Sequence, residues 1–231
     1  MQNNTLPISI IIPVFNEELV IENILNQVSH LNASEIIIVD GQSTDATVDL
    51  IKHYDVQLYV ADHRSRSFQM NLGAKAATTP YLFFLHADVK LPENFNSILR
   101  KAIEHKVILA NFKIQFDWDQ WFLKANAFFS RFTWNGFQFG DQGLFIENKL
   151  FKQIEGYDNG LPLAEGNEII RRARRHAKLT KLDTNLLVSA RKYKKHGVYK
   201  LQLYYFLIYS LIRIGINQKL ILKIYYKLLK E

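Results

Sequence analysis

The chain has 231 residues, of which 48% are hydrophobic and 22% are charged. These fractions are those of an ordinary globular protein and exclude a largely disordered chain, and the length suits one large domain or one domain with an appendage. The chain has no cysteine, which excludes disulfides and thiolate chemistry and fits a reducing, cytoplasmic location. The formal net charge of +7 at pH 7 favours an anionic partner, such as nucleic acid, a phosphorylated substrate or an acidic lipid.

The apolar runs of the sequence are short. The first run ends at Asn16, Glu17 and Glu18 and has no basic residues before it, so we interpret it as a strand and not as a signal peptide. The sequence has no stretch of about 18 uncharged apolar residues, which is the length that a membrane-spanning helix needs. We therefore expect no spanning helix.

Short apolar runs alternate with longer amphipathic stretches in the first half of the chain. The runs predict strands at residues 8–14, 35–40, 57–60, 81–85 and 107–116. Helices are expected to start at Glu17, to cover residues 43–53 and 66–77, and to start again at Pro92. Because the strands are almost wholly apolar, the pattern predicts an α/β fold with a mostly parallel sheet covered by helices on both faces.

Polar residues close three of the predicted strands, namely Asn16, Asp40 and Asp88. In parallel sheets ligands bind beyond the carboxyl ends of the strands, so these side chains are expected at one edge. Asp40 either accepts hydrogen bonds from a ligand or forms the turn before the next helix. Together with His86, Asp88 would suit Mg²⁺ or Mn²⁺ if phosphate oxygens supply the remaining ligands, although a single His-x-Asp is a weak signal on its own.

Four motifs follow one another in a specific order: SIIIPVFNEE, IIIVDGQSTDAT, RSFQMNLGAKAA and LFFLHADV. Together they resemble the N-terminal half of family 2 glycosyltransferases with the GT-A fold. The match is best to a small bacterial subgroup in which the family's Asp-x-Asp motif is written His-Ala-Asp. The segments FGDQGLFI, FKQIEGYD and SARKYKKHGVYK extend the resemblance over nearly the whole chain.

The resemblance implies a nucleotide-diphosphate-sugar donor and assigns residues to it. Asp40 would contact the base, Arg66 would lie near the diphosphate, and Asp88 would coordinate Mg²⁺ or Mn²⁺, with His86 in place of the family's first acid. A guanidinium beside phosphate oxygens makes chemical sense because the two groups form charge-assisted hydrogen bonds. The residues implied in donor binding are Pro13, Asn16, Glu17, Asp40, Arg66 and Arg191.

The general base is the position at which the match fails. The family carries Glu-Asp at the start of the acceptor-side helix, with the Asp as base, whereas Glu165 is followed here by Gly166. Glu165, Glu168 and Asp141 are the remaining candidates, although acids at a helix start also simply favour the helix dipole. The alternative is a non-catalytic or weakly active nucleotide-sugar-binding protein.

The last part of the chain is helical, aromatic and basic. Lys219, Lys223, Lys227 and Lys230 share one face of a predicted helix, which indicates either contact with an anionic membrane or lysines in water on a helix packed against the domain. The expected division is a GT-A domain over residues 1–197, with its nucleotide-sugar half at 1–116 and its acceptor half at 117–197, and a tail over residues 198–231.

The resemblance implies transfer of a sugar, with inversion, to a hydroxyl acceptor that belongs to a lipid or a glycan. The chain would be cytoplasmic and peripheral on the inner membrane face. A dehydrogenase is disfavoured because no glycine follows the first strand, where the dinucleotide fingerprint needs one. No familiar recognition motif for nucleic acid is present, so no nucleic-acid partner is expected.

Overall fold

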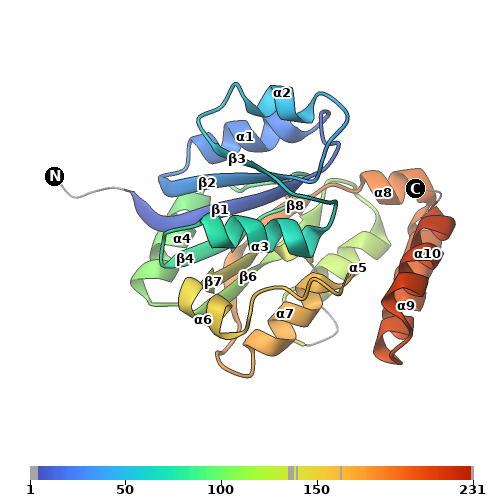
Figure 1. The fold of residues 1–231 in the computed structure, drawn as a ribbon. Coiled ribbons are helices and arrows are strands. Elements are labelled where there is room, and N and C mark those ends of the chain that lie inside the picture. The colour runs from blue at the N-terminus through green and yellow to red at the C-terminus, as the bar shows by residue number, and fades with distance from the viewer. Residues whose placement is uncertain (1–4, 135–137, 139, 162, 230–231) are drawn as a thin grey trace.

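An eight-stranded sheet forms the centre of the protein in the computed structural model, which describes residues 5–134, 138, 140–161 and 163–229. Helices cover both faces of the sheet, and two C-terminal helices lie to one side of it (Figure 1). The predicted α/β fold with a mostly parallel sheet flanked by helices is therefore confirmed.

The strands differ in length and come from the whole chain. They are β1 (Leu6–Val14), β2 (Ala33–Asp40), β3 (Gln57–Val60), β4 (Tyr81–Phe84), β5 (Val89–Lys90), β6 (Leu109–Phe116), β7 (Leu144–Glu147) and β8 (Thr180–Val188). The helices are α1 (Ile21–Ser29), α2 (Thr47–Ile51), α3 (Arg66–Ala76), α4 (Phe95–Glu104), α5 (Trp121–Phe129), α6 (Asn148–Gln153), α7 (Glu165–Ala173), α8 (Arg191–His196), α9 (Val198–Arg213) and α10 (Gln218–Leu229). A 3₁₀ turn covers Gly140–Gln142.

The strand order is β3-β2-β1-β4-β7-β6-β8-β5. Pairing is parallel from β3 through β2 and β1 to β4, and again between β6 and β8. The strands β7 and β5 run against their neighbours. Because β7 is antiparallel to both β4 and β6, the carboxyl ends of β1, β2, β4, β6 and β8 point to the same edge of the sheet.

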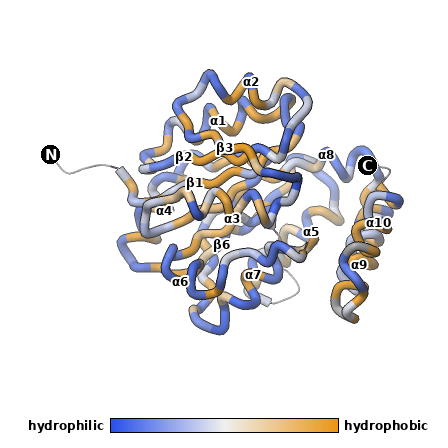
Figure 2. The backbone as a smooth tube through the Cα atoms, viewed as in Figure 1, coloured by the Kyte–Doolittle hydropathy of each residue, from blue (hydrophilic) through white to orange (hydrophobic). Residues whose placement is uncertain are grey.

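The apolar sequence of β1 explains its place inside the sheet. Ile10 and Ile12 pack with α1, α2 and α4, whereas Ile11 packs with α3, α6 and α7, and all three are fully buried. Successive side chains of a strand point to opposite faces, so a strand covered on both sides needs a continuous apolar run. Figure 2 shows the same arrangement, with hydrophobic residues along the strands and hydrophilic ones in most of the loops.

The first two helices are shorter than the sequence predicts. The helix expected from Glu17 begins at Ile21, and the helix expected over residues 43–53 covers only Thr47–Ile51. The residues expected in the first turns of these helices bond to one another instead. The backbone N–H groups of Asn16, Glu17 and Glu18 donate to the side chains of Ser43, Thr47 and Asp45, respectively.

Several elements of the second half have no counterpart in the sequence prediction. The strand β8 is one of them, and it carries Lys181, Asp183 and Asn185 among its apolar residues. These polar residues interrupt the apolar pattern by which a strand is predicted. In the described part of the chain, no helix is both long enough and apolar enough to cross a lipid bilayer.

Gly73 lets α3 lie close to the sheet. A Cβ atom at this position would lie 2.5 Å from Cγ2 of Ile11 and 3.2 Å from Cγ2 of Val39. Since Arg66 is the first residue of α3, this close approach also fixes the position of Arg66 above the strand ends.

We expect Gly73→Ala to lower the free energy of unfolding by up to about 2 kcal/mol, because overpacking costs ~1–3 kcal/mol and the helix preference of alanine returns only about 1 kcal/mol. Urea denaturation measures the difference. Lys75→Ala, an exposed change in the same helix, is the control and should stay within about 0.5 kcal/mol of the wild type. A Gly73→Ala protein more stable than the wild type would contradict the close packing described here.

Candidate active site

The ends of three neighbouring strands bring together residues that are far apart in the sequence. Asp40 ends β2, Val14 ends β1, and the segment with His86 and Asp88 follows β4. Val14 is the register partner of Asp40, and β4 lies on the other side of β1. Asp40 and Asp88 therefore lie at the same edge of the sheet, one on each side of β1.

Asp40 is almost fully buried, with 1% of its surface exposed. Its Oδ2 atom accepts the backbone N–H of Ser43 at 3.0 Å, which is the turn-forming contact. Its Oδ1 atom is buried and has no hydrogen-bond partner within the described ranges. A buried carboxylate oxygen without a partner is costly, and an N–H group of a ligand would satisfy it.

A guanidinium connects the loops that follow β1 and β4. Nη2 of Arg191 donates to both carboxylate oxygens of Glu17, at 2.9 and 2.7 Å, and lies 3.6 Å from Oδ2 of Asp88. Burial lowers the pKa of Arg191, but the carboxylates of Glu17 and Asp88 outweigh this and leave the pKa above its usual value. The first residue of α8 is thus a permanent positive charge at the strand ends.

Arg66 is the second positive charge of the site. Its Nη1 atom lies 3.7 Å from Oε1 of Glu165, and about half of its side chain is exposed. Burial lowers the pKa of Arg66, whereas the charges of Glu165, Asp141 and Asp88 together raise it above the usual value. Arg66 therefore lies within electrostatic reach of carboxylates from three different segments of the chain.

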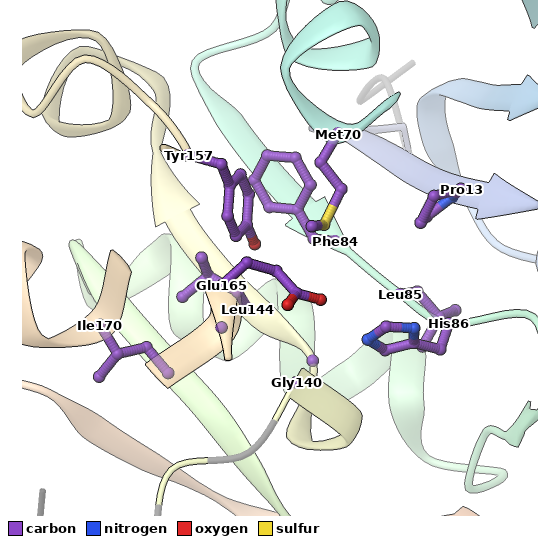
Figure 3. A pocket seen from close by; sticks show the side chains of 12 residues that line it. Pro13, Met70, Phe84, Leu85, His86, Gly140, Leu144, Tyr157, Glu165 and Ile170 are labelled. Atoms are coloured by element: carbon purple, nitrogen blue, oxygen red, sulfur yellow. The ribbon is translucent and has the colours of Figure 1, made fainter. Parts of the chain in front are cut away.

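A small pocket lies between α3, the end of β4 and the start of α7 (Figure 3). Figure 3 shows the carboxylate of Glu165 directed into the pocket, toward the side on which His86 lies. The cavity measures about 20 Å³, which holds roughly one water molecule. Its lining residues are Pro13, Met70, Phe84, Leu85, His86, Gly140, Gly143, Leu144, Tyr157, Glu165, Gly166 and Ile170.

The three candidate bases have different surroundings. Glu165 is buried, with 8% of its surface exposed, and lines the pocket. Asp141 lies in the 3₁₀ turn next to the pocket and is half-buried. Glu168 points elsewhere, because both of its carboxylate oxygens accept from the guanidinium of Arg172 at 2.7–2.9 Å. Only Glu165 thus combines burial with a place in the pocket.

Asp88 and His86 provide a carboxylate and an imidazole for a divalent cation. Within the described ranges, no group of three or more His, Asp or Glu side chains is arranged to hold an ion. Two protein ligands are enough when substrate phosphates complete the shell of Mg²⁺ or Mn²⁺. The contact of Asp88 with Arg191 is long, at 3.6 Å, and leaves this carboxylate suited to a cation. The residues present therefore fit an ion that is bound together with a diphosphate.

Gln69 joins the carboxyl ends of two strands, and sequence analysis assigned no role to it. Its Nε2 atom donates to the carbonyl oxygens of Val14 and Val39, both at 2.8 Å, and its side chain is 2% exposed. The signal available in the sequence was a glutamine three residues after Arg66, at the start of a predicted helix. This side chain holds β1 and β2 at the point where Asp40 is presented.

Asn71 connects α3 with the loop before α7. Its Nδ2 atom donates to the carbonyl of Tyr157 at 2.8 Å and to Oδ1 of Asn159 at 2.9 Å, and its Oδ1 accepts the N–H of Tyr157 at 2.9 Å. Tyr157 lines the pocket, and burial together with the charge of Glu165 raises its pKa well above the usual value. Its hydroxyl therefore stays protonated well above neutral pH.

Carboxylates and guanidinium groups gathered at the carboxyl ends of parallel strands define a ligand site of the nucleotide-binding α/β class. The model of the family described as "Glycosyl transferase family 2" matches residues 9–156, which is well over half of the chain. The chain belongs to this family. The resemblance drawn from the motifs is thereby confirmed, and the His-Ala-Asp subgroup stays a prediction.

Two curated relatives are similar to part of the chain. A dolichyl N-acetyl-α-D-glucosaminyl phosphate 3-β-D-2,3-diacetamido-2,3-dideoxy-β-D-glucuronosyltransferase of Methanococcus voltae is 35% identical over 99 residues, which are 38% of this chain and 31% of that protein. The uncharacterized glycosyltransferase YibD of Escherichia coli K12 is 30% identical over 120 residues, which are 48% of this chain and 34% of that protein. The chain thus matches about a third of the length of each relative.

Solved structures share the fold over most of the chain. TarS of S. aureus in complex with UDP-GlcNAc has a TM-score of 0.66 and 16% identity, covering 96% of this chain and 71% of that one. The mannosyltransferase PcManGT of Pyrobaculum calidifontis, in complex with GDP-Man and Mn²⁺, has a TM-score of 0.67 and 16% identity, covering 95% of this chain and 69% of that one. At this identity the likeness establishes the GT-A fold alone.

Proposed function

We propose that the chain transfers a sugar from a nucleoside-diphosphate-sugar donor to a hydroxyl acceptor, with inversion and with the help of Mg²⁺ or Mn²⁺. The observation that carries the proposal is the position of Arg66, which lies within reach of Glu165, Asp141 and Asp88 at the strand ends. A cationic group among several carboxylates suits a reaction in which a diphosphate departs and a hydroxyl loses its proton. Family membership supports the same reaction.

The donor would lie along the edge formed by β2, β1 and β4. Asp40 would accept a hydrogen bond from the base through its unpaired Oδ1 atom, and Pro13, Asn16 and Glu17 would line the nucleoside pocket. Two solved structures of the same fold hold UDP-GlcNAc and GDP-Man, which supports a uridine or guanosine diphosphate sugar. Arg66 and Arg191 would pair with the diphosphate, exchanging their present carboxylate partners for phosphate oxygens.

Asp88 and His86 would hold the cation. Such an ion supplies charge neutralisation to the departing diphosphate. Before the donor binds, the protein's own contribution on this side is positional, because Arg191 then keeps the loops after β1 and β4 together through Glu17 and Asp88. Arg66 and Arg191 add further positive charge where negative charge develops on the leaving group.

Glu165 is the proposed general base, with Asp141 as the second candidate. The acceptor oxygen would form a bond to the anomeric carbon from the face opposite the diphosphate, while the bond from that carbon to the diphosphate oxygen breaks. The hydroxyl proton would pass to the carboxylate of Glu165, and the electron pair would leave with the diphosphate. This single displacement inverts the anomeric carbon. Gly166 offers no carboxylate, and Glu168 is taken up by Arg172.

The acceptor would be a lipid or a glycan bound on the side formed by residues 117–197. A second cavity of about 340 Å³ lies beside α5, and its lining includes Phe116, Trp118, Asp117 and Asp119. Aromatic faces and carboxylates are suited to sugar rings and their hydroxyls. The name of the Methanococcus voltae relative describes transfer to a dolichyl-phosphate-linked sugar, which supports a lipid-linked acceptor for this chain.

The C-terminal helices would bring the enzyme to an anionic membrane on its cytoplasmic side. α9 exposes Leu203 and Phe206, with 63% and 67% of their surfaces accessible, and α10 exposes Lys223 and Lys227. Apolar side chains beside lysines suit the interface of an acidic bilayer. Lys230 and the side chain of Lys219, which share the predicted face, lie outside the described residues. The proposed boundary between the domain and the tail stays at residue 197.

A screen of nucleotide sugars by thermal shift tests donor binding and metal use. We expect a uridine or guanosine diphosphate sugar at 100 times its Kd to raise the melting temperature by roughly 5–10 °C, since binding adds about 2.7 kcal/mol and each kcal/mol gives ~2–4 °C in a domain of this size. Mn²⁺ should be required for the full shift. Asp88→Ala should remove the part that depends on Mn²⁺, and Asp49→Ala, an exposed change on α2, should not. A shift that is the same with and without Mn²⁺ would contradict metal use, and binding without turnover would favour the non-catalytic alternative.

The identity of the base is tested by neutralising each carboxylate. We expect Glu165→Gln to lower kcat by roughly 10²–10⁴-fold, the contribution typical of a general base, while the Kd for UDP stays within about twofold because the change affects the transition state. Asp141→Asn and Glu168→Gln are the comparison variants, assayed by product formation well below their melting temperatures. A larger loss of kcat in Asp141→Asn than in Glu165→Gln would assign the base to Asp141.

Membrane contact is tested by sedimentation with vesicles. We expect the double variant Lys223→Glu/Lys227→Glu to bind vesicles of phosphatidylglycerol and phosphatidylcholine about 10-fold more weakly or worse, since each basic residue near an anionic surface contributes ~1 kcal/mol. Lys149→Glu/Lys152→Glu changes the net charge equally on α6 and serves as the matched control. Equal losses in the two variants would show that only net charge matters and that the tail is no docking surface.

A further inference from the structure

A buried network of polar side chains lies beneath the 3₁₀ turn beside the pocket. Nζ of Lys181 donates to Oε1 of Gln142 at 2.8 Å and to Oε1 of Gln138 at 3.1 Å. Nδ2 of Asn111 donates to the same two oxygens at 2.7 and 2.9 Å. Lys181 and Asn111 are register partners in β8 and β6. Two neighbouring strands therefore present two donors to two glutamine side chains of one loop.

The network fixes the segment that enters the site. Gln138 donates from Nε2 to the carbonyls of Phe132 and Trp134 at 2.9 and 3.0 Å, and Gln142 is the last residue of the 3₁₀ turn. The side chains of Gln138 and Gln142 are 1% and 0% exposed. Lys181 thus connects β8 to Gln138 and to Gln142.

The same 3₁₀ turn forms one wall of the pocket. Gly140 lines the pocket, and a Cβ atom added there would lie 3.0 Å from Nε2 of His86. Asp141 follows directly and lies within electrostatic reach of Arg66. A shift of Gln142 would therefore move both the residue that contacts His86 and one of the site's carboxylates.

Burying a lysine to hold a loop costs free energy, because its charged form is less favourable away from water. Burial and the nearby charge of Arg174 lower the pKa of Lys181 to about 7, so folding makes its charged form less favourable. Oδ1 of Asn111 is buried too and has no partner within the described ranges. An apolar side chain would fill the space without these costs, but it would take one donor away from each of two buried glutamine oxygens and leave their orientation less defined.

We propose that Lys181 is a positioning residue for the acceptor side of the transfer reaction. It acts through Gln142, whose side chain it orients, and so sets where Gly140 and Asp141 stand relative to His86 and Glu165. The inference rests on the proposed glycosyl transfer. A misplacement of about 1 Å in such a site can cost as much as ~10²-fold in rate, whereas the donor residues at the ends of β1 and β2 lie on other strands than Asn111 and Lys181.

The test compares Lys181→Met with Lys178→Met, which makes the same change at an exposed lysine in the same region. The probes are UDP-N-acetylglucosamine and GDP-mannose, with water as acceptor and nucleotide release as the signal. We expect Lys181→Met to lower kcat about 10-fold and to leave the Kd for the nucleotide within about twofold, the pattern of a change that acts on the transition state only. Unchanged kcat in Lys181→Met would overturn the proposal.

A double-variant cycle tests whether Gln142 carries the effect. The losses in kcat of Lys181→Met and Gln142→Met should not add, because both changes break the same contact. Additive losses, or a fall in melting temperature without a fall in kcat, would show a merely structural role.

Amide hydrogen exchange gives a readout that does not depend on turnover. In Lys181→Met, the amides of Gly140–Gln142 should exchange faster while those of β1 and β4 keep their protection. Unchanged exchange in the turn would overturn the proposal even if the variant were less active. Failure of the proposed function itself would look different, because the wild type would then bind and turn over neither nucleotide sugar while the exchange result still decides whether Lys181 anchors the turn.

Discussion

The burial of β1 on both faces is the constraint on which the rest of the structure depends. Its isoleucines pack against helices above and below the sheet, so the strand must lie inside, with parallel neighbours β2 and β4 on either side. Because these strands are parallel, the residues at their carboxyl ends lie at the same edge of the sheet. Gln69 then bonds to the carbonyls of Val14 and Val39 near the ends of β1 and β2, and Gly73 lets its helix approach closely enough to do so.

The charges at this edge stabilise one another. Arg191 pairs with Glu17 and Asp88, and Arg66 lies near Glu165. Each guanidinium group therefore lies between carboxylates that would otherwise repel one another. Opposite charges that lie close together in a partly buried place attract one another more strongly than they would in water. The two guanidinium groups also place positive charge at this edge of the sheet, and positive charge there would attract an anionic ligand.

Sequence analysis predicted the nucleotide half of the fold well and the other half poorly, for physical reasons. The strands that end at Val14 and Asp40 are nearly pure apolar runs, and a strand buried on both faces leaves that signature. β8 carries Lys181 because a buried network replaces apolar contacts on one of its faces, so its pattern is mixed. The helix expected from Glu17 starts later because its N–H groups bond to the side chains of a distant loop, which no local pattern reports.

The site could be predicted in part for the same reason. Asp40 and Asp88 were expected at a common edge because strand ends in parallel sheets converge, and the structure places them there, on either side of β1. Which carboxylate faces the pocket could not be predicted, since Glu165 and Glu168 differ by less than one helical turn and only the partner, Arg172, separates them. Their roles in catalysis stay predictions.

The hydrogen bonds of α3 to the segment before α7 limit how the molecule can change shape. Ser67 donates to the carbonyl of Leu161 at 3.1 Å, and Asn71 holds the backbone of Tyr157 on both its N–H and its carbonyl. Breaking these bonds would cost roughly 1 kcal/mol each. These bonds hold α3 and the segment before α7 together, so the two could move apart only after the bonds between them had broken.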